Sequence, residues 1–127
     1  MIERQLSVFL ENRPGVLAAV CNALVEKNVN IIGFSISDTV DYAVVRLVVD
    51  DPTTATHVLG EGGALVVETD VLALKMENSP GALQKVAEKL AQAKVNIEYA
   101  YGSGDGDEGL VFIRVSDTVK AEASLAE

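Results

Sequence analysis

Two segments of the chain combine residues that suit the binding of a small polar ligand. Asn12, Pro14 and Gly15 lie in the first segment, and Asn30 begins the second expected strand, which we expect to lie beside the first. Amide side chains both donate and accept hydrogen bonds, which suits a zwitterion. A Pro-Gly step at the start of a helix offers unpaired backbone N–H groups and a partial positive charge, which favour a carboxylate. This pattern indicates a site for a small α-amino acid.

The same residues recur later in the chain at a constant spacing. The segment ENRPGVL from Glu11 reappears as ENSPGAL from Glu77, an offset of 66 residues (77 − 11). The same offset relates residues 29–31 (VNI) to residues 95–97 (VNI) without a gap. Chance is a poor explanation for one spacing that covers a loop, a helix and two strands. We therefore expect two modules, over residues 1–69 and 70–127.

Each copy has the sequence pattern of a β-α-β-β-α-β unit. Apolar runs predict strands, and apolar residues at helical spacing after the Pro-Gly step predict a helix that has proline at its first position. The helix face expected in the core consists of Leu17, Val20, Cys21 and Leu24, repeated as Leu83, Val86, Ala87 and Leu90. The elements expected in the first copy are strands at 6–10, 29–37, 42–49 and 64–67, a turn at 38–41, and helices from 14 to about 28 and at 52–59.

This order predicts an α+β fold of two tandem ferredoxin-like modules, each an antiparallel sheet with its helices on one face. The second copy departs from the first after Asp117, where a helical stretch runs to Glu127. Its last strand is therefore missing, and we expect an unprotected sheet edge there.

The composition argues against several classes of partner. Ten Lys and Arg face 19 Asp and Glu, for a net charge of −9. A surface this acidic repels nucleic-acid phosphates and anionic lipid headgroups, so we expect neither nucleic acid nor membrane as a partner. The single cysteine cannot form an intrachain disulfide, the N-terminus lacks the order of a signal peptide, and no apolar run reaches the ~20 residues of a membrane span. We expect a cytoplasmic protein.

Residues suited to catalysis are sparse. The only histidine, His57, has Ala123 at its repeat position and lies in a polar stretch, so we expect it at the surface. Cys21, with Ala87 as its counterpart, is expected to be a small core residue. The acidic, glycine-rich segment 102–109 lacks the order of a calcium loop and is interpreted as a flexible hairpin turn that could cover a ligand site. We expect no catalysis, no cofactor and no metal.

Two features are open to more than one interpretation. Asparagine before Pro-Gly is a common turn former and asparagine after a helix is a common cap, so a purely structural role is an alternative to ligand binding. Tyr99 and Tyr101 replace Gly33 and Ser35 of the first copy and lie on one strand face. The sequence leaves open whether these tyrosines belong to the core, an interface or a pocket wall.

The loop from Glu11 and the VNI segment resemble the ACT domain, and the loop is most similar to that of the ACT domain of phosphoglycerate dehydrogenase. Two copies with little else resemble small stand-alone tandem-ACT proteins, and the resemblance covers residues 6–125. It implies amino-acid binding where domains pair, with an effect on an attached or associated enzyme. The dehydrogenase domain has a ligand-binding histidine where this chain has Leu10 and Met76. That departure implies a more apolar side-chain pocket than a serine site.

The resemblance also implies which residues bind the ligand. Both loop asparagines and both asparagines of the Asn-Ile pairs are expected to hold it, and the loop backbone and the following isoleucines are expected to line the site. These residues are Asn12, Pro14, Gly15, Val16, Leu17, Asn30 and Ile31 in the first copy, and Asn78, Gly81, Ala82, Leu83, Asn96 and Ile97 in the second.

The function expected from these residues is that of a non-catalytic regulatory protein. It would bind a small amino acid at the interface between ACT modules and transmit this binding to an associated enzyme or oligomer. The expected partners are the amino acid, a second copy of the chain in a homodimer, and an amino-acid biosynthetic enzyme. The alternative is a ligand-free assembly module of an enzyme complex that pairs through exposed sheet edges.

Overall fold

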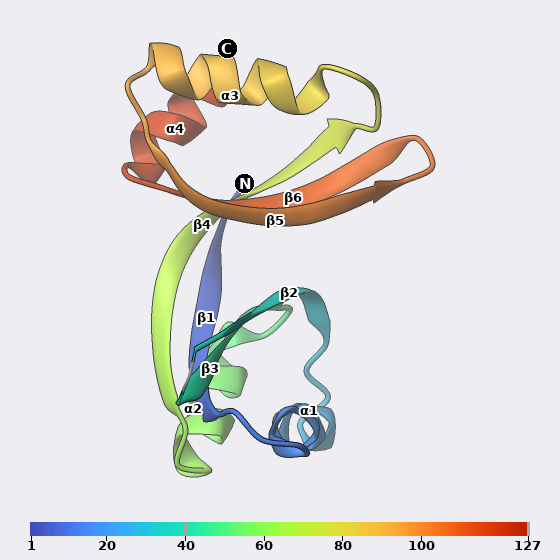
Figure 1. The fold of residues 1–127 in the computed structure, drawn as a ribbon, viewed down its shortest axis with the longest axis vertical. Coiled ribbons are helices and arrows are strands. Elements are labelled where there is room, and N and C mark those ends of the chain that lie inside the picture. The colour runs from blue at the N-terminus through green and yellow to red at the C-terminus, as the bar shows by residue number, and fades with distance from the viewer. Residues whose placement is uncertain (40, 127) are drawn as a thin grey trace. The chain divides into compact units, whose positions relative to one another are not determined.

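The structure is a computed structural model of the chain that describes residues 1–39 and 41–126. The chain divides into two compact units (Figure 1). Arg4–Thr69 form the N-terminal unit, and Met1–Glu3 together with Asp70–Glu127 form the C-terminal unit. In the part of the chain described, no helix is long and apolar enough to cross a membrane.

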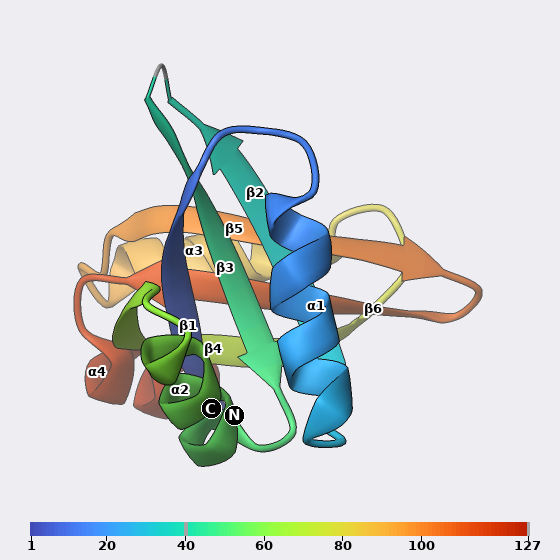
Figure 2. The same cartoon turned by 90° about the horizontal axis from the view of Figure 1, so that it is seen from below.

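The N-terminal unit has the predicted β-α-β-β-α-β order. Its elements are β1 (Ile2–Glu11), α1 (Val16–Glu26), β2 (Ile31–Asp38), β3 (Tyr42–Val49), α2 (Pro52–Glu61) and the first part of β4 (Leu65–Glu77). The strand order is β2-β3-β1-β4, so β2 is an outer strand. β3 pairs antiparallel with both β1 and β2. Figure 2 shows α1 and α2 on the same face of these strands. Val40, in the predicted turn, lies outside the described residues.

The C-terminal unit repeats this order up to its second helix. It contains the last part of β4, α3 (Ala82–Gln92), β5 (Ile97–Asp105), β6 (Glu108–Val115) and α4 (Thr118–Leu125). The strand order is β4-β6-β5, so β5 is an outer strand, as β2 is in the other unit. Both helices lie on one face of these strands (Figure 1). Among the described residues no strand follows α4.

The edge of β4 in the C-terminal unit is not fully open, contrary to the expectation. The N–H of Ala73 donates a hydrogen bond to the carbonyl oxygen of Met1 at 2.6 Å. The N-terminal residues therefore cover part of the edge that a fourth strand would occupy. The strand predicted at 64–67 is also not a separate strand, because β4 runs without a break from Leu65 to Glu77, into the second copy of the repeat.

The two cores occupy equivalent positions of the repeat. Leu6, Val20, Leu24, Val29, Val45 and Val49 are buried in the N-terminal unit, and Leu72, Leu90, Val95 and Val115 are buried in the C-terminal unit. The predicted helix face is only partly correct, because Leu17 is 38% exposed and Leu83 is 57% exposed. Leucine at these positions follows the first helical residue directly and lies outside the core cluster of its unit.

Glycine with a positive φ angle begins the first helix of each unit. Gly15 has φ +89° and Gly81 has φ +90°, values at which a side chain would be strained. The helices therefore begin at Val16 and Ala82. The prediction of proline at the first helical position is wrong, because Pro14 lies in the turn before this glycine.

Aspartate caps the second helix of each unit. Asp51 accepts hydrogen bonds from the N–H and the hydroxyl of Thr54, and Asp117 accepts one from the N–H of Lys120. The bonds from Thr54 lower the pKa of the Asp51 carboxyl below its ordinary value, because they stabilise its charged form. These caps fix where the chain leaves β3 and β6 for the helix face.

The core assignment predicts a matched pair of stability losses. Leu24→Ala and Leu90→Ala should each lower the free energy of unfolding by about 2–5 kcal/mol, because each truncates a buried leucine and leaves a cavity. Chemical denaturation followed by circular dichroism measures this loss. Leu83→Ala, at a 57% exposed position, is the control and should cost less than about 1 kcal/mol. A loss at Leu83 equal to that at Leu90 would contradict the assignment.

Candidate functional site

A hollow of about 200 Å³ lies beside the Asn78 loop in the C-terminal unit. One wall is the end of β4 with the loop and the start of α3, and the other wall is the β5–β6 hairpin. Its lining residues are Met76, Glu77, Asn78, Ser79, Ala82, Leu83, Gly102, Ser103, Gly104, Gly109 and Val111. Three of these, Asn78, Ala82 and Leu83, were predicted as ligand-binding residues.

Asn78 joins this loop to the hairpin turn. Its Nδ2 donates to the carbonyl oxygen of Gly106 at 2.8 Å, and its backbone N–H donates to the carbonyl oxygen of Asp107 at 2.9 Å. A Cβ atom at Gly104 would stand 2.7 Å from Asn78 Oδ1, which is closer than real side chains approach. Glycine at 104 therefore permits the close approach of loop and hairpin. The acidic hairpin thus lies against the candidate site.

The equivalent place in the N-terminal unit carries larger side chains. The repeat puts Ile36 and Asp38 at the positions of Gly102 and Gly104. Asn12 Nδ2 donates a hydrogen bond to Asp38 Oδ1. A carboxylate beside this loop disfavours the carboxylate of an amino-acid ligand, since like charges repel. The two loops therefore differ in the room and the charge that they offer.

The second pair of asparagines lies at the other end of each sheet. Asn30 is held by its backbone, which donates to Asp50 Oδ1 at 2.9 Å and accepts from the N–H of Asp50 at 3.1 Å. Asn12 instead follows β1, whose last residues pair with the beginning of β3. The eight residues of β3 separate the two ends by roughly 25 Å, at about 3.3 Å per residue.

The structure therefore does not bring the two predicted asparagines of one module together. Asn96 shows the same placement, because its N–H donates to Ser116 Oγ at 3.0 Å, beyond the end of β6. Asn78 lies beside the opposite end of β6, where Glu77 pairs with Glu108. The expectation that Asn30 lies beside the first strand is also wrong, because β3 separates β2 from β1.

The other predicted site residues divide between loop and core. Pro14 and both helix-starting glycines are exposed in the loops, and Val16 and Ala82 are half-buried at the first turn of their helices. Ile31 and Ile97 are half-buried and pack against the core of their own units. Their position accounts for an apolar side chain there without any ligand.

Tyr99 and Tyr101 do not face the hollow. They pair with Arg114 and Phe112, and the ring of Tyr101 stacks on that of Phe112 at 5.3 Å between centroids. The hollow beside Asn78 lies on the opposite face of β5, the face that carries Gly102 and Gly104 and is covered by the helices. The sequence reasoning missed these two glycines as site residues. The sequence contains a signal for them, because the repeat aligns Gly102 and Gly104 with the larger Ile36 and Asp38.

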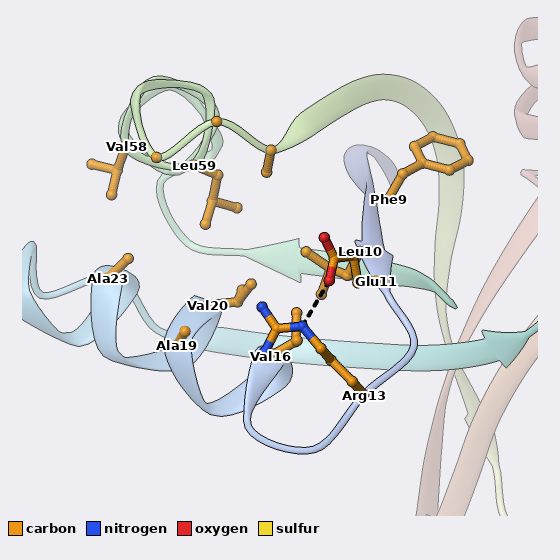
Figure 3. Close-up of a pocket in the computed structure, with 13 residues that line it drawn as sticks. Phe9, Leu10, Glu11, Arg13, Val16, Ala19, Val20, Ala23, Val58 and Leu59 are labelled. Atoms are coloured by element: carbon orange, nitrogen blue, oxygen red, sulfur yellow. Dashed lines mark hydrogen bonds and ion pairs between the residues drawn. The ribbon is translucent and has the colours of Figure 1, made fainter. Parts of the chain in front are cut away.

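A second hollow, of about 310 Å³, lies between α1 and α2 (Figure 3). Ala19 and Ala23 on α1 face Val58 and Leu59 on α2 across it. Near the loop, Arg13 Nε and Glu11 Oε2 form an ion pair at 2.7 Å, and both side chains are largely exposed. The hollow thus has apolar walls and a neutralised charge pair at one end.

The single histidine and the single cysteine lie on different helices, α2 and α1. His57 is 71% exposed on α2 and pairs with Glu61 at 3.2 Å. Cys21 is half-buried on α1 with a free thiol. No three His, Cys, Asp or Glu side chains within residues 1–39 and 41–126 come together in a way that could hold a metal ion.

Proteins of known structure have a similar fold. Protein BT0572 from Bacteroides thetaiotaomicron is 36% identical over 99% of this chain and 88% of that chain, with a TM-score of 0.95. The regulatory subunit of aspartate kinase from Thermus thermophilus, in a ligand-free form, is 20% identical over 97% of this chain and 88% of that chain, with a TM-score of 0.74. The Thermus flavus regulatory subunit is 19% identical over 99% and 92% of the two chains, with a TM-score of 0.68.

The similarity to the two Thermus structures shows a shared fold and nothing further, because the sequence identity is low. No curated protein sequence matches the chain. The ACT domain pair family matches residues 1–126, which is nearly the whole sequence. This match agrees with the repeated loops, the two βαββα units and the glycine that starts the first helix of each. The chain belongs to the ACT domain pair family.

Proposed function

We propose that the chain is a non-catalytic regulatory protein that binds a small amino acid where two ACT modules pair. The observation that carries this proposal is the hollow beside Asn78, which has a helix start, an amide and an apolar wall but lies far from Asn96 of its own module. A helix N-terminus favours the ligand carboxylate, and amide oxygens accept bonds from its ammonium group. Met76, Leu83 and Val111 favour a short aliphatic side chain.

A second copy of the chain completes this site in our proposal. An outer strand has unpaired backbone groups that can pair with another strand. If β2 of a second copy pairs antiparallel with β5, the start of β2 lies beside the Asn78 end of β5. Asn30 of the second copy then approaches the hollow that Asn96 of the same module cannot reach. One amide of the site would thus come from each copy.

Side-chain size favours pairing β2 with β5 rather than either strand with itself. On the helix face, β2 exposes Phe34 (61%) and Ile36 (48%), whereas β5 has Ala100 and Gly102 at the equivalent positions. Large side chains of one strand can therefore lie over small residues of the other. Two copies of β2 would set large against large, and two copies of β5 would leave a gap, which close packing disfavours.

The opposite sheet face shows the reverse pattern. There β2 carries Gly33 and Ser35, and β5 carries Tyr99 and Tyr101. A symmetric dimer that uses both edges would form two such pairings. Amino-acid binding at this interface would stabilise the paired state by linkage, which gives the ligand an effect on an associated enzyme.

The comparisons support a regulatory role in amino-acid metabolism. The two Thermus structures are regulatory subunits of aspartate kinase. By analogy we propose an amino-acid biosynthetic enzyme as the regulated partner. The Asp38 carboxylate beside Asn12 favours a ligand-free role in assembly for the N-terminal loop, because it repels the carboxylate of an amino acid.

Amino-acid binding can be measured directly. We expect one or a few small aliphatic amino acids, among the twenty tested by calorimetry, to bind with a dissociation constant below about 1 mM, as for regulatory ligands that contribute roughly 4 kcal/mol or more. Asn78→Ala should weaken this binding more than Asn12→Ala, because the Asp38 carboxylate beside Asn12 repels the carboxylate of an amino acid. Equal losses, or no binding by any of the twenty, would contradict the proposal.

Gly104→Ala should close the hollow. The added methyl would stand 2.7 Å from Asn78 Oδ1, so the amide must move and binding should weaken by about 1–3 kcal/mol. Calorimetry with the amino acid identified in the screen measures this loss. Gly60→Ala is the control, because its Cβ meets no atom within 4 Å. Unchanged affinity in Gly104→Ala would place the ligand elsewhere.

Phe34→Glu should weaken the dimer. A charge at this exposed position of β2 would be buried against β5 of the second copy without a partner, which costs several kcal/mol. Analytical ultracentrifugation should show the mass fall towards that of one chain. Val119→Glu makes the same change at a 73% exposed position on α4 and should leave the mass unchanged. A dimer that survives Phe34→Glu would exclude this edge.

A further inference from the structure

The groove between α3 and α4 concentrates positive charge in an acidic chain. Two hollows, of about 260 and 400 Å³, adjoin at Lys89. The residues that line them are Met1, Leu74, Lys75, Met76, Lys85, Val86, Lys89 and Leu125 in the first, and Lys89, Gln92, Ala93, Lys120, Ala123 and Ser124 in the second. Within residues 1–39 and 41–126, neither lining includes an Asp or Glu, although the chain has 19 acidic residues against ten basic ones.

The repeat shows that the lysines are not needed to form the groove. Figure 3 shows its counterpart between α1 and α2, where Ala19 and Ala23 occupy the positions of Lys85 and Lys89. Thr54 likewise corresponds to Lys120. The apolar floor is retained, because Val20 and Leu59 correspond to Val86 and Leu125, which line the first of the two hollows. The C-terminal unit thus keeps the floor and gains charge at the rim.

The fold gains little from this charge. Lys85 and Lys89 are four residues apart on α3, where like charges repel and alanine forms a better helix. In the part of the chain described, no ion pair includes Lys85 or Lys120. Ser124 Oγ donates to the carbonyl oxygen of Lys89 at 3.2 Å, so a neutral contact links the two helices. A ligand of opposite charge accounts for Lys85 and Lys120 better than folding does.

We propose that this groove binds a short acidic segment of a partner protein, with an apolar side chain seated on the floor. Lys75 on β4, Lys85 on α3 and Lys120 on α4 together exceed what one carboxylate can neutralise, so the ligand must carry several acidic groups. The floor of Leu74, Val86 and Leu125 takes an aliphatic side chain between them. Extended polyanions fit less well, because a net charge of −9 repels them outside the groove. The site shares only Met76 with the lining of the Asn78 hollow.

A synthetic peptide tests this proposal on the full chain. The acetylated, amidated peptide AEELLEELLEEA should cause saturable shifts of α3 and α4 resonances in the NMR spectrum of the ¹⁵N-labelled protein, more strongly at low salt. The peptides AKKLLKKLLKKA and AEEAAEEAAEEA, which lack the acidic or the apolar groups, should bind far more weakly. The measured resonances belong to α3 and α4 and not to the Asn78 loop. A failure of peptide binding is therefore distinguishable from a failure of amino-acid binding.

Charge removal supplies the matched control. The double variant Lys85→Ala, Lys120→Ala should weaken peptide binding roughly tenfold, as expected for the loss of two ion pairs. Lys27→Ala, which removes the same charge from the end of α1, should leave the affinity unchanged. The proposal is overturned if the acidic peptide produces no saturable shift, if the lysine peptide binds equally well, or if vesicles of phosphatidylglycerol bind the groove more tightly than the peptide.

Discussion

The antiparallel pairing of β3 with both β1 and β2 determines where Asn12 and Asn30 lie in the N-terminal unit. Since β3 lies between them, β2 becomes an outer strand with free backbone groups, and the loop after β1 lies at the opposite end of the sheet from the start of β2. The same pairing recurs around β6. Each module therefore has one asparagine of the pair at one end of its sheet and the other asparagine at the opposite end. Our proposal that the site is shared between copies follows from this geometry.

Duplication gave the two units the same backbone, and their differences lie in side chains that do not alter it. At the outer strands, large and small residues exchange places between copies, with Phe34 against Ala100 on one face and Ser35 against Tyr101 on the other. Between the helices, alanines in one unit correspond to lysines in the other. Both changes occur at surfaces rather than in the shared apolar core. They favour distinct roles for two units with one fold.

Much of the fold could be predicted from the sequence, because apolar periodicity and the constant offset of the repeat report local structure. The site was harder to predict, since spacing along the chain does not show which end of a strand a residue occupies. The sequence predicts that Asn12 and Asn30 bind one ligand together, but the strand register places them at opposite ends of the sheet. The repeat distinguishes Gly104 from Asp38, but only the structure shows that Gly104 lies against Asn78. The cover that Met1 gives to β4 depends on a contact between distant parts of the sequence.

Mixing two defective variants tests most directly whether one amino-acid site takes an amide from each of two copies. Asn78→Ala and Asn30→Ala should each abolish tight binding in calorimetry. After the two are unfolded and refolded together, mixed dimers contain one site with both amides intact. Random pairing of symmetric dimers then restores about a quarter of the wild-type binding capacity. No recovery in the mixture, with dimers confirmed by mass, would contradict a shared site.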